Sequence, residues 1–371
     1  MKVPLQLQNT ILRSAAAMLR HLPGGRRSAT PARILVIRLG NLGDIIVALP
    51  AFQALRKQFP GAHLTLLTSP TKRGAPGAIE VLEHDPTFDE MIVYYEDESA
   101  RPAFLRDLRN RFRASQFDLA VILPDDRTPF KSLLKYLALA ASAGIRHTTG
   151  ARLVAVEEHD MGQAPRIMRL LEPLGAHQIG PMPWIALSPE VESKARRLLA
   201  AAAGSPVIGM QCGAKRPANR WLPDRFIETG RHIVQRYGHW VVLTGSPGER
   251  ELTARMKAGI GDRCIDLAGE TTIAELAAVA RNCAAFVSND TGTMHVAAAM
   301  GTPVVAIFSA RDHKHRWYPY GLQHRVLRED IECSPCLADV CPKYPVPECL
   351  NRIGAARVMA ALDDILQNEV R

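Results

Sequence analysis

The stretch from Ala284 to Pro303 restricts the fold of this chain more than any other. A short apolar run of strand-forming residues, AAFVS, leads into the polar turn 289–293, and an Ala-rich segment follows. Gly301 can cap the end of a helix, and Pro303 cannot continue one. The pattern predicts a strand, a turn and a helix in direct succession, as in α/β proteins.

The start of this predicted helix suits an anion. Its first backbone N–H groups have no partner within the helix, and the helix dipole is positive there. Thr291 and Thr293 add hydroxyl donors. A pyrophosphate or a sugar phosphate fits that combination. An ordinary capped helix in an α/β sheet is the alternative.

Length and composition indicate a two-domain globular protein. The chain has 371 residues, more than a single core usually holds, with 47% hydrophobic and 22% charged residues. We expect it to be cytoplasmic, because it has no membrane-length apolar run and its start lacks the apolar core of a signal peptide. The net charge of +9 favours an anionic partner: nucleic acid, a phosphorylated substrate or anionic lipid.

Residues 1–32 form a basic extension. Its apolar residues fall at helical spacing: Ile11, Leu12, Ala15, Met18, Leu19 and Leu22. Its charged residues are all basic: Lys2, Arg13, Arg20, Arg26 and Arg27. A basic amphipathic helix can lie on an anionic membrane surface. A helix packed on its own domain, or a frayed tail, is the alternative.

Strand-length apolar runs alternate with helix-length segments through both halves of the chain. In the first half we expect strands at 33–37, 63–68, 91–95 and 117–123, a further candidate at 144–150, and helices at 45–59, 103–113 and 131–143. In the second half, after a Pro-rich linker at 179–189, we expect strands at 206–210, 240–244, 263–267, 284–288 and 303–308, and helices at 223–237, 250–257, 272–282 and 353–370. Such alternation predicts parallel sheets in two Rossmann-like domains that face each other across a cleft.

Ligands of such sheets bind outside the carboxyl ends of the strands. Four loops lie at such ends: the turn with Asp44, the loop with Lys215, the loop with Gly245 and the turn with Asp290. Asp44 begins a helix, where a carboxylate either caps the helix or acts as a base on an acceptor hydroxyl. Neither GxxxxGK[ST] nor a GxGxxG after a strand is present, which argues against a nucleotide hydrolase or a dehydrogenase.

Two segments together resemble a known family. RILVIRLGNLGDIIVALPAFQAL (33–55) paired with FVSNDTGTMHVAAAMGTPVVAIF (286–308) is similar to glycosyltransferase family nine, typified by ADP-heptose:lipopolysaccharide heptosyltransferases. The resemblance runs from residue 33 to the C-terminus. It implies the GT-B fold, with an acceptor-binding domain at 33–185, a nucleotide-sugar-binding domain at 186–350, and a last helix at 351–371 that crosses back to the first domain.

The resemblance also implies roles for residues. Asp44 would be the catalytic base of an inverting transfer that requires no metal. The donor's diphosphate and sugar would lie on the turn Asp290, Thr291, Gly292, Thr293 and His295. Around the first turn, Arg38, Asn41 and Gly43 would serve the acceptor side. His295 has an alternative, which is to pack within its own domain.

Two features depart from the family pattern. Where members often have a Lys in K-x-W-P, this chain has Asn219, so Lys215, Arg216 or Arg220 would have to supply the charge, and Glu249 would hold the donor ribose. The second is a quartet in a Pro-rich loop at 333–349: Cys333, Cys336, Cys341 and Cys349. Its spacing is typical of a structural zinc site or a disulfide pair, with free thiols as a further alternative, and a reducing compartment favours zinc over disulfides.

The sequence therefore predicts a glycosyltransferase that moves a heptose or a related sugar from an ADP-sugar to the lipid A and core oligosaccharide of lipopolysaccharide. It would work at the inner face of the bacterial inner membrane, as a peripheral protein and without nucleic acid. Alternatives are a nucleotide-sugar epimerase of the same shape and a non-enzymatic basic module that binds anionic lipid or nucleic acid.

Overall fold

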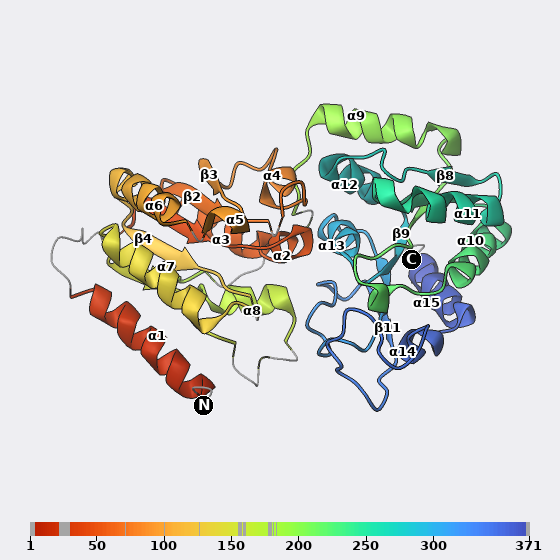
Figure 1. Cartoon of the computed structure of the whole chain (residues 1–371). Coiled ribbons are helices and arrows are strands. Elements are labelled where there is room, and N and C mark those ends of the chain that lie inside the picture. Colours follow the sequence, from red (N-terminus) through yellow and green to blue (C-terminus); the bar gives the residue numbers. More distant parts are fainter. Residues whose placement is uncertain are drawn as a thin grey trace. The chain divides into compact units, whose positions relative to one another are not determined.

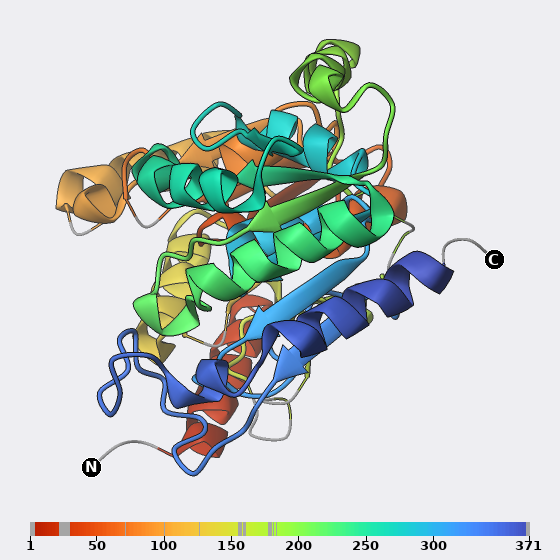
Figure 2. The same ribbon diagram turned by 90° about the vertical axis from the view of Figure 1, so that its right-hand side faces the viewer.

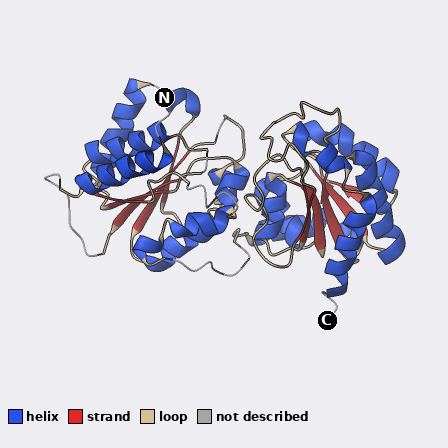
Figure 3. Ribbon diagram, turned by 90° about the horizontal axis from the view of Figure 1, so that it is seen from below, coloured by secondary structure: helices blue, strands red, loops and turns tan. Residues whose placement is uncertain are grey.

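The chain divides into two compact units, Met1–Pro181 and Met182–Arg371, each built on one parallel sheet between helices (Figures 1 and 3). The computed structural model describes residues 4–21, 30–70, 72–99, 101–125, 127–154, 158, 161–176, 180, 182 and 184–368. The predicted α/β class with two parallel sheets is confirmed. Residues 179, 181 and 183 of the predicted linker at 179–189 lie outside the described residues.

The first sheet has the order β3-β2-β1-β4-β5. Its strands, all parallel, are β1 (Arg33–Ile37), β2 (His63–Thr68), β3 (Glu90–Val93), β4 (Leu119–Ile122) and β5 (His147–Thr149). Leu and Ile dominate these strands because helices cover both faces of the sheet. The chain runs outward from β1 to β3 and then returns to β1's other side with β4, so the strand order reverses at β1.

Eight α-helices accompany this sheet in the described residues. They are α1 (Leu5–Leu19), α2 (Leu42–Ile46), α3 (Leu49–Gln58), α4 (Ala78–Val81), α5 (Glu96–Ser99), α6 (Pro102–Ser115), α7 (Phe130–Ser142) and α8 (Gln163–Arg169). The single helix expected at 45–59 is wrong, since α2 and α3 are separate. Pro50 is the cause: it has no N–H for the carbonyl of Ile46, and its ring would clash with the preceding turn.

Helix α1 packs on its own unit. Leu12 and Leu19 are buried among side chains of α6, α7 and β4, and α1 contacts α7 and β5. The side-chain amide of Asn9 donates to the carbonyl of Leu153 at 3.2 Å and accepts from its N–H at 2.8 Å. Of the predicted basic residues, Lys2, Arg26 and Arg27 lie outside the described residues. No helix in the described ranges is long and apolar enough to cross a bilayer.

The second sheet has the order β11-β10-β9-β6-β7-β8, again fully parallel. Its strands are β6 (Val207–Gln211), β7 (Trp240–Thr244), β8 (Cys264–Asp266), β9 (Ala285–Asn289), β10 (Val304–Phe308) and β11 (Arg325–Arg328). The edge strand β11 was not predicted, because its sequence, RVLR, has too few apolar residues to mark a buried strand. The strand order reverses at β6.

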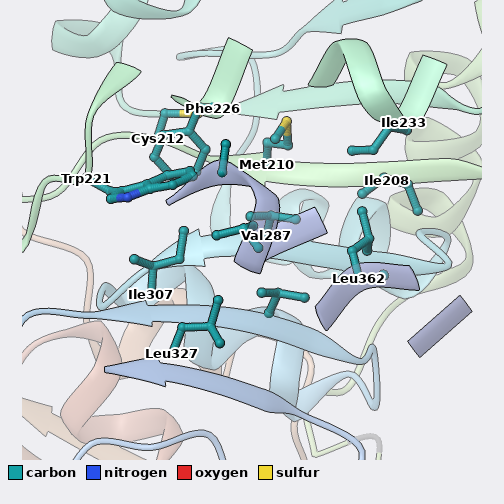
Figure 4. Close-up of a cluster of buried hydrophobic side chains, with 14 of the residues drawn as sticks. Ile208, Met210, Cys212, Trp221, Phe226, Ile233, Val287, Ile307, Leu327 and Leu362 are labelled. Carbon is teal, nitrogen blue, oxygen red and sulfur yellow. The ribbon is translucent and has the colours of Figure 1, made fainter. Parts of the chain in front are cut away.

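Two hydrophobic layers sandwich the second sheet. Its helices are α9 (Pro189–Leu198), α10 (Pro223–Tyr237), α11 (Arg250–Ile260), α12 (Ile273–Arg281), α13 (Gly292–Ala299), α14 (Glu348–Asn351) and α15 (Ala355–Asn368). Alternate residues of each strand face opposite layers, as Ile208 and Met210 do toward α10 and α15 and Val207 does toward α12. Figure 4 shows the first layer, where Trp221 and Phe226 lie against Met210.

Helix α15 is built into the second unit. Its apolar face, with Val358, Leu362 and Ile365, lies over β9, β10 and β11 beside α10 (Figure 2). The indole N–H of Trp221 donates to the carbonyl of Ile353 just before α15, at 2.8 Å. The expected return of this segment to the first domain stays a prediction.

Candidate active site

The predicted residues of each unit gather where the strand order reverses. In the first sheet that point lies between β1 and β4, and Asp44 follows β1. In the second it lies between β6 and β9, and Lys215 and Asp290 follow these two strands. In open parallel sheets this is the crevice where ligands bind, because the loops on its two sides diverge.

The turn after β1 fixes the carboxylate of Asp44. Asp44 is the third residue of α2, and its Oδ2 accepts the N–H of Asn41 at 2.9 Å. Gly40 has φ +135°, and a Cβ there would lie 2.3 Å from the Asp44 Cβ. Only glycine therefore allows the chain to fold back over this side chain, which is 6% exposed.

A second carboxylate and a guanidinium join Asp44 from the loop after β4. Arg127 Nη2 lies 2.9 Å from Asp44 Oδ1 and 3.3 Å from Asp125 Oδ2. The hydroxyl of Thr128 donates to Asp125 Oδ1 at 2.6 Å. The sequence analysis did not single out these residues; the available signal was that they directly follow the strand expected at 117–123, beside β1.

The surroundings push the pKa values of the two carboxyl groups in opposite directions. Burial raises the pKa of Asp44, and the charges of Arg127 and Arg38 only partly oppose it. Burial also raises the pKa of Asp125, but Arg38, the Thr128 hydroxyl and Arg127 outweigh it, so that pKa is lowered. Asp44 is thus the carboxylate better suited to take up a proton, as a general base requires.

Arg38 holds the site together from beneath. It is fully buried; Nε and Nη2 donate to the carbonyl of Asp44 at 3.2 and 2.8 Å, and Nη1 donates to the carbonyl of Leu123 at 3.1 Å. It therefore ties α2 to the end of β4. Asn41 and Gly43 are partly exposed in the turn. A direct contact of these three residues with an acceptor stays a prediction.

In the second unit, the turn after β9 is anchored by Asn289. Its Oδ1 accepts the N–H of Trp221 at 3.1 Å, and its Nδ2 donates to the carbonyl of Cys212 at 2.7 Å. Thr291 is the N-cap of α13, and its Oγ1 accepts the N–H of Met294. Residues 290–293 are partly exposed, whereas the rest of α13 is buried. The first turn of α13 thus presents its N–H groups where an anion can reach them.

Asp290 is held by Asn219, the residue that the sequence analysis places where family members often have a Lys. Asn219 Nδ2 donates to Asp290 Oδ2 at 2.9 Å, and its Oδ1 accepts the hydroxyl of Ser309 at 2.7 Å. Burial and the charge of Asp312 raise the pKa of Asp290 to about 7 against the opposing effects of Arg216, Arg311 and Asn219. Asp290 is therefore only partly ionised at neutral pH.

The other predicted donor residues line neighbouring loops. Lys215 and Arg220 are exposed, and Arg220 Nε donates to the carbonyl of Ala214 at 2.8 Å. Glu249 Oε2 accepts the N–H and the hydroxyl of Ser246 at 2.7 and 2.9 Å. A Cβ on Gly213 would lie 1.5 Å from Glu249 Oε1, so this carboxylate lies against the backbone of the loop after β6. That loop and Glu249 are therefore adjacent.

His295 faces the protein interior. It is 5% exposed, and its ring makes an edge-on contact with Trp317 at a centroid distance of 6.1 Å. Burial, with a smaller effect of His324, lowers the pKa of His295 to about 4, so the imidazole is neutral at physiological pH. This is the packing alternative of the sequence analysis, and a contact with the donor stays a prediction.

The four cysteines of the Pro-rich loop are free thiols. Cys349 is buried in α14, Cys333 and Cys341 are partly exposed, and Cys336 is exposed. Burial raises the pKa of the Cys349 thiol, with smaller contributions from Cys336 and Cys333. Across the part of the chain that the structure describes, no three His, Cys, Asp or Glu side chains are placed to hold a metal ion, so the quartet is not preformed for one. Outside this loop, Cys212, Cys264 and Cys283 are buried in the core of the second unit.

Comparison with known proteins identifies the chain's relatives. The model of glycosyltransferase family 9 (heptosyltransferase) matches residues 105–346. Lipopolysaccharide heptosyltransferase 2 of Escherichia coli is 26% identical over 302 residues, 74% of this chain and 82% of that protein. Lipopolysaccharide heptosyltransferase 1 of Pseudomonas aeruginosa is 24% identical over 375 residues, 90% of this chain and 98% of that protein.

Solved structures show the same likeness. E. coli ADP-heptose LPS heptosyltransferase II has a TM-score of 0.67 and 25% identity, over 91% of this chain and all of that one. A family 9 glycosyl transferase of Veillonella parvula has a TM-score of 0.75 and 23% identity, over 93% of this chain and all of that one. These matches confirm the predicted GT-B fold.

The raised pKa of Asp290 predicts a pH-dependent stability. The unfolded chain releases this proton near pH 4 and the folded one near pH 7, so folding becomes less favourable as the pH rises between those values. We expect Asp290→Asn to stabilise the protein by about 2 kcal/mol at pH 8, less than the full pKa shift implies because the residue is partly exposed. At pH 4.5, where the folded protein keeps the proton on Asp290, the substitution should change the stability little. Urea unfolding at both pH values measures this. Asp224→Asn, at an exposed carboxylate of the same unit, is the control; a gain at pH 8 no larger than in that control contradicts the prediction.

Proposed function

The chain belongs to glycosyltransferase family 9 and is a glycosyltransferase, and we propose that it transfers a heptose from ADP-heptose to the core oligosaccharide of lipopolysaccharide. The relatives carry the names of lipopolysaccharide heptosyltransferases, and one solved structure is titled as an ADP-heptose enzyme. The observation that carries the proposal is the placement of Asp44 and Asp290 at the two points where strand order reverses.

In this proposal Asp44 is the general base. Its carboxylate takes the proton of an acceptor hydroxyl while that oxygen attacks the anomeric carbon of the donor. The bond from that carbon to the diphosphate oxygen breaks, ADP leaves with the electron pair, and the configuration at the carbon inverts. In the structure, Arg127 pairs with Oδ1 of Asp44, and its side chain is half exposed. When an acceptor hydroxyl binds to Oδ1, the guanidinium can move aside and keep its ion pair with Asp125.

On the donor side, the first turn of α13 would hold the diphosphate. Its N–H groups and positive dipole end are fixed before the reaction, so they stabilise the charge that develops on the leaving group without further reorganisation. Thr291 and Thr293 would add hydroxyl contacts, and Glu249 would accept a ribose hydroxyl. Because backbone and basic side chains supply the positive charge, this assignment requires no catalytic metal.

Asp44→Asn tests the base directly. We expect kcat to fall by about 10²- to 10⁴-fold, because an amide cannot accept the proton, while ADP binding by calorimetry stays within about twofold. Asp118→Asn is the matched control: Asp118 is a buried carboxylate that accepts from the N–H groups of Ala32 and Arg33 at the other end of β1. Turnover of Asp44→Asn within tenfold of the wild type would remove Asp44 from the mechanism.

We also propose that the protein lies on the cytoplasmic face of the inner membrane through α1. Leu7, Ile11 and Met18 expose 50%, 38% and 68% of their surface, and residues 1–32 contain no Asp or Glu. An exposed apolar stripe on a basic helix fits an anionic lipid surface.

Replacing these three residues together by Ala tests the membrane proposal. We expect binding to vesicles that contain phosphatidylglycerol to weaken about tenfold or more, because the apolar area available for insertion is lost. Sedimentation with vesicles measures it, with neutral vesicles for comparison. Leu322→Ala, at a residue 98% exposed in the other unit, is the control. Equal binding of the triple variant and the wild type contradicts the proposal.

Finally, we propose that the cysteine quartet binds a structural zinc ion, for which its thiols would have to draw together. The sequence spacing supports this, and Cys333 and Cys336 both act electrostatically on the Cys349 thiol. We expect one zinc per chain by elemental mass spectrometry and its loss in Cys349→Ser, but not in Cys283→Ser, whose thiol is buried elsewhere. Protein without metal, or with metal that survives Cys349→Ser, overturns the proposal.

A further inference from the structure

Arg311 is a buried guanidinium in the loop after β10. It is 7% exposed, and it contacts the loop segment between Cys336 and Cys341. Nε donates to the carbonyl of Ala338 at 2.7 Å, and Nη2 donates to the carbonyl of Leu337 at 2.9 Å. In return, the N–H of Leu337 donates to the carbonyl of Arg311 at 2.7 Å. The two loops are thus joined at both backbone and side chain.

Asp339 extends this clamp to the loop after β6. Its Oδ1 lies 3.2 Å from Arg311 Nη2 and 2.7 Å from Arg216 Nε. Its carbonyl accepts the N–H of Ala218 at 3.0 Å. Asp339 therefore binds two arginines, although Arg216 lies 123 positions before it in the sequence.

The clamped arginines lie beside the Asp290 turn. Asn219 follows Ala218 and bonds to Asp290, and its other amide atom accepts the hydroxyl of Ser309, two residues before Arg311. The charges of Arg216 and Arg311 both act on the carboxyl of Asp290. The contacts thus connect Arg311 to the first turn of α13, where the proposed function places the donor's diphosphate.

Arg311 retains donor capacity that its neighbours do not use. Among the described residues, Nη1 has one contact, with Asp312 Oδ2 at 3.5 Å, longer than an ordinary hydrogen bond. Asp312 is already bound by Arg316 Nη1 at 2.7 Å. The charged side chains joined here are Arg216, Arg311, Arg316, Asp290, Asp312 and Asp339. Three arginines here face three carboxyl groups, and burial raises the pKa of one of these, Asp290.

We propose that Arg311, held in place by Leu337–Asp339 and supported by Arg216, binds the diphosphate of the nucleotide-sugar beside α13. This assignment rests on the proposed function and extends it to a residue outside both sequence motifs. A planar guanidinium with a free edge suits phosphate oxygens, and its burial means that little side-chain freedom is lost when the ligand binds. The segment between Cys336 and Cys341 is then part of the wall of the donor site.

Calorimetric titration of the full-length protein with ADP and with AMP tests the proposal. We expect Arg311→Gln to weaken ADP binding about 10- to 100-fold and AMP binding less than threefold, because the lost contact is to the second phosphate. Asp339→Asn, which loosens the arginines without removing them, should weaken ADP binding about three- to tenfold. A preserved preference for ADP over AMP in Arg311→Gln overturns the proposal.

Arg225→Gln is the matched control. Arg225 Nη1 likewise donates to loop carbonyls, those of Asn351 and Ile353 at 2.7 and 2.8 Å, but Arg225 is not among the groups that shift the pKa of Asp290. Its variant should keep the ADP preference of the wild type even if its melting temperature falls. If Arg311→Gln does not fold, Arg311→Lys decides: ADP binding should weaken about three- to tenfold, and an unchanged value counts against Arg311. Failure of the wild type to bind ADP would instead reject the proposed function.

Discussion

Reversal of strand order at β1 and at β6 governs where this chain can hold a ligand. The two loops that diverge from each reversal leave a space that neither strand fills, and all strands of a parallel sheet end at the same edge. In the first unit that edge carries Asp44, and in the second it carries Asp290 and the start of α13. The topology of each sheet thus brings these candidate residues to the edge where a ligand can bind.

The same electrostatic arrangement recurs at both edges. A carboxyl group with a raised pKa, Asp44 or Asp290, lies at or just before the start of a helix. Arg127, from the loop after β4, pairs with Asp44, whereas Arg216 and Arg311 act on Asp290 through their charges. Burial favours the neutral acid, and the arginine favours the carboxylate. The pKa of each carboxyl group is therefore raised in spite of the nearby arginines, to about 7 for Asp290, and a raised pKa suits a group that takes up a proton.

What the sequence could predict follows from the range of the interactions. Asp44 and Asp290 could be named as candidates from the sequence, because each lies in a local strand–turn–helix pattern whose residues are neighbours in the chain. Arg127 and Arg311 could not be named in this way, because their contacts join loops that are distant in the sequence and no local pattern records such pairing. Pro50 indicates a helix break, but the apolar periodicity continues from 45 to 59, so a single helix was predicted there. The edge strand β11 was not predicted because it lacks the apolar run that marks the other strands.

The cysteine-rich loop is bound into the second unit by its middle. Leu337, Ala338 and Asp339 hold Arg311 through backbone carbonyls and one carboxylate, and these residues lie between Cys336 and Cys341. A bond that held the thiols of Cys336 and Cys341 in place would restrict the conformations open to this segment. Less conformational entropy would then be lost when the segment binds Arg311. Release of the thiols would have the opposite effect. The cysteine-rich loop is thus joined to the Asp290 turn by contacts of Arg311, Asp339 and Asn219, with Arg311 held between the loops.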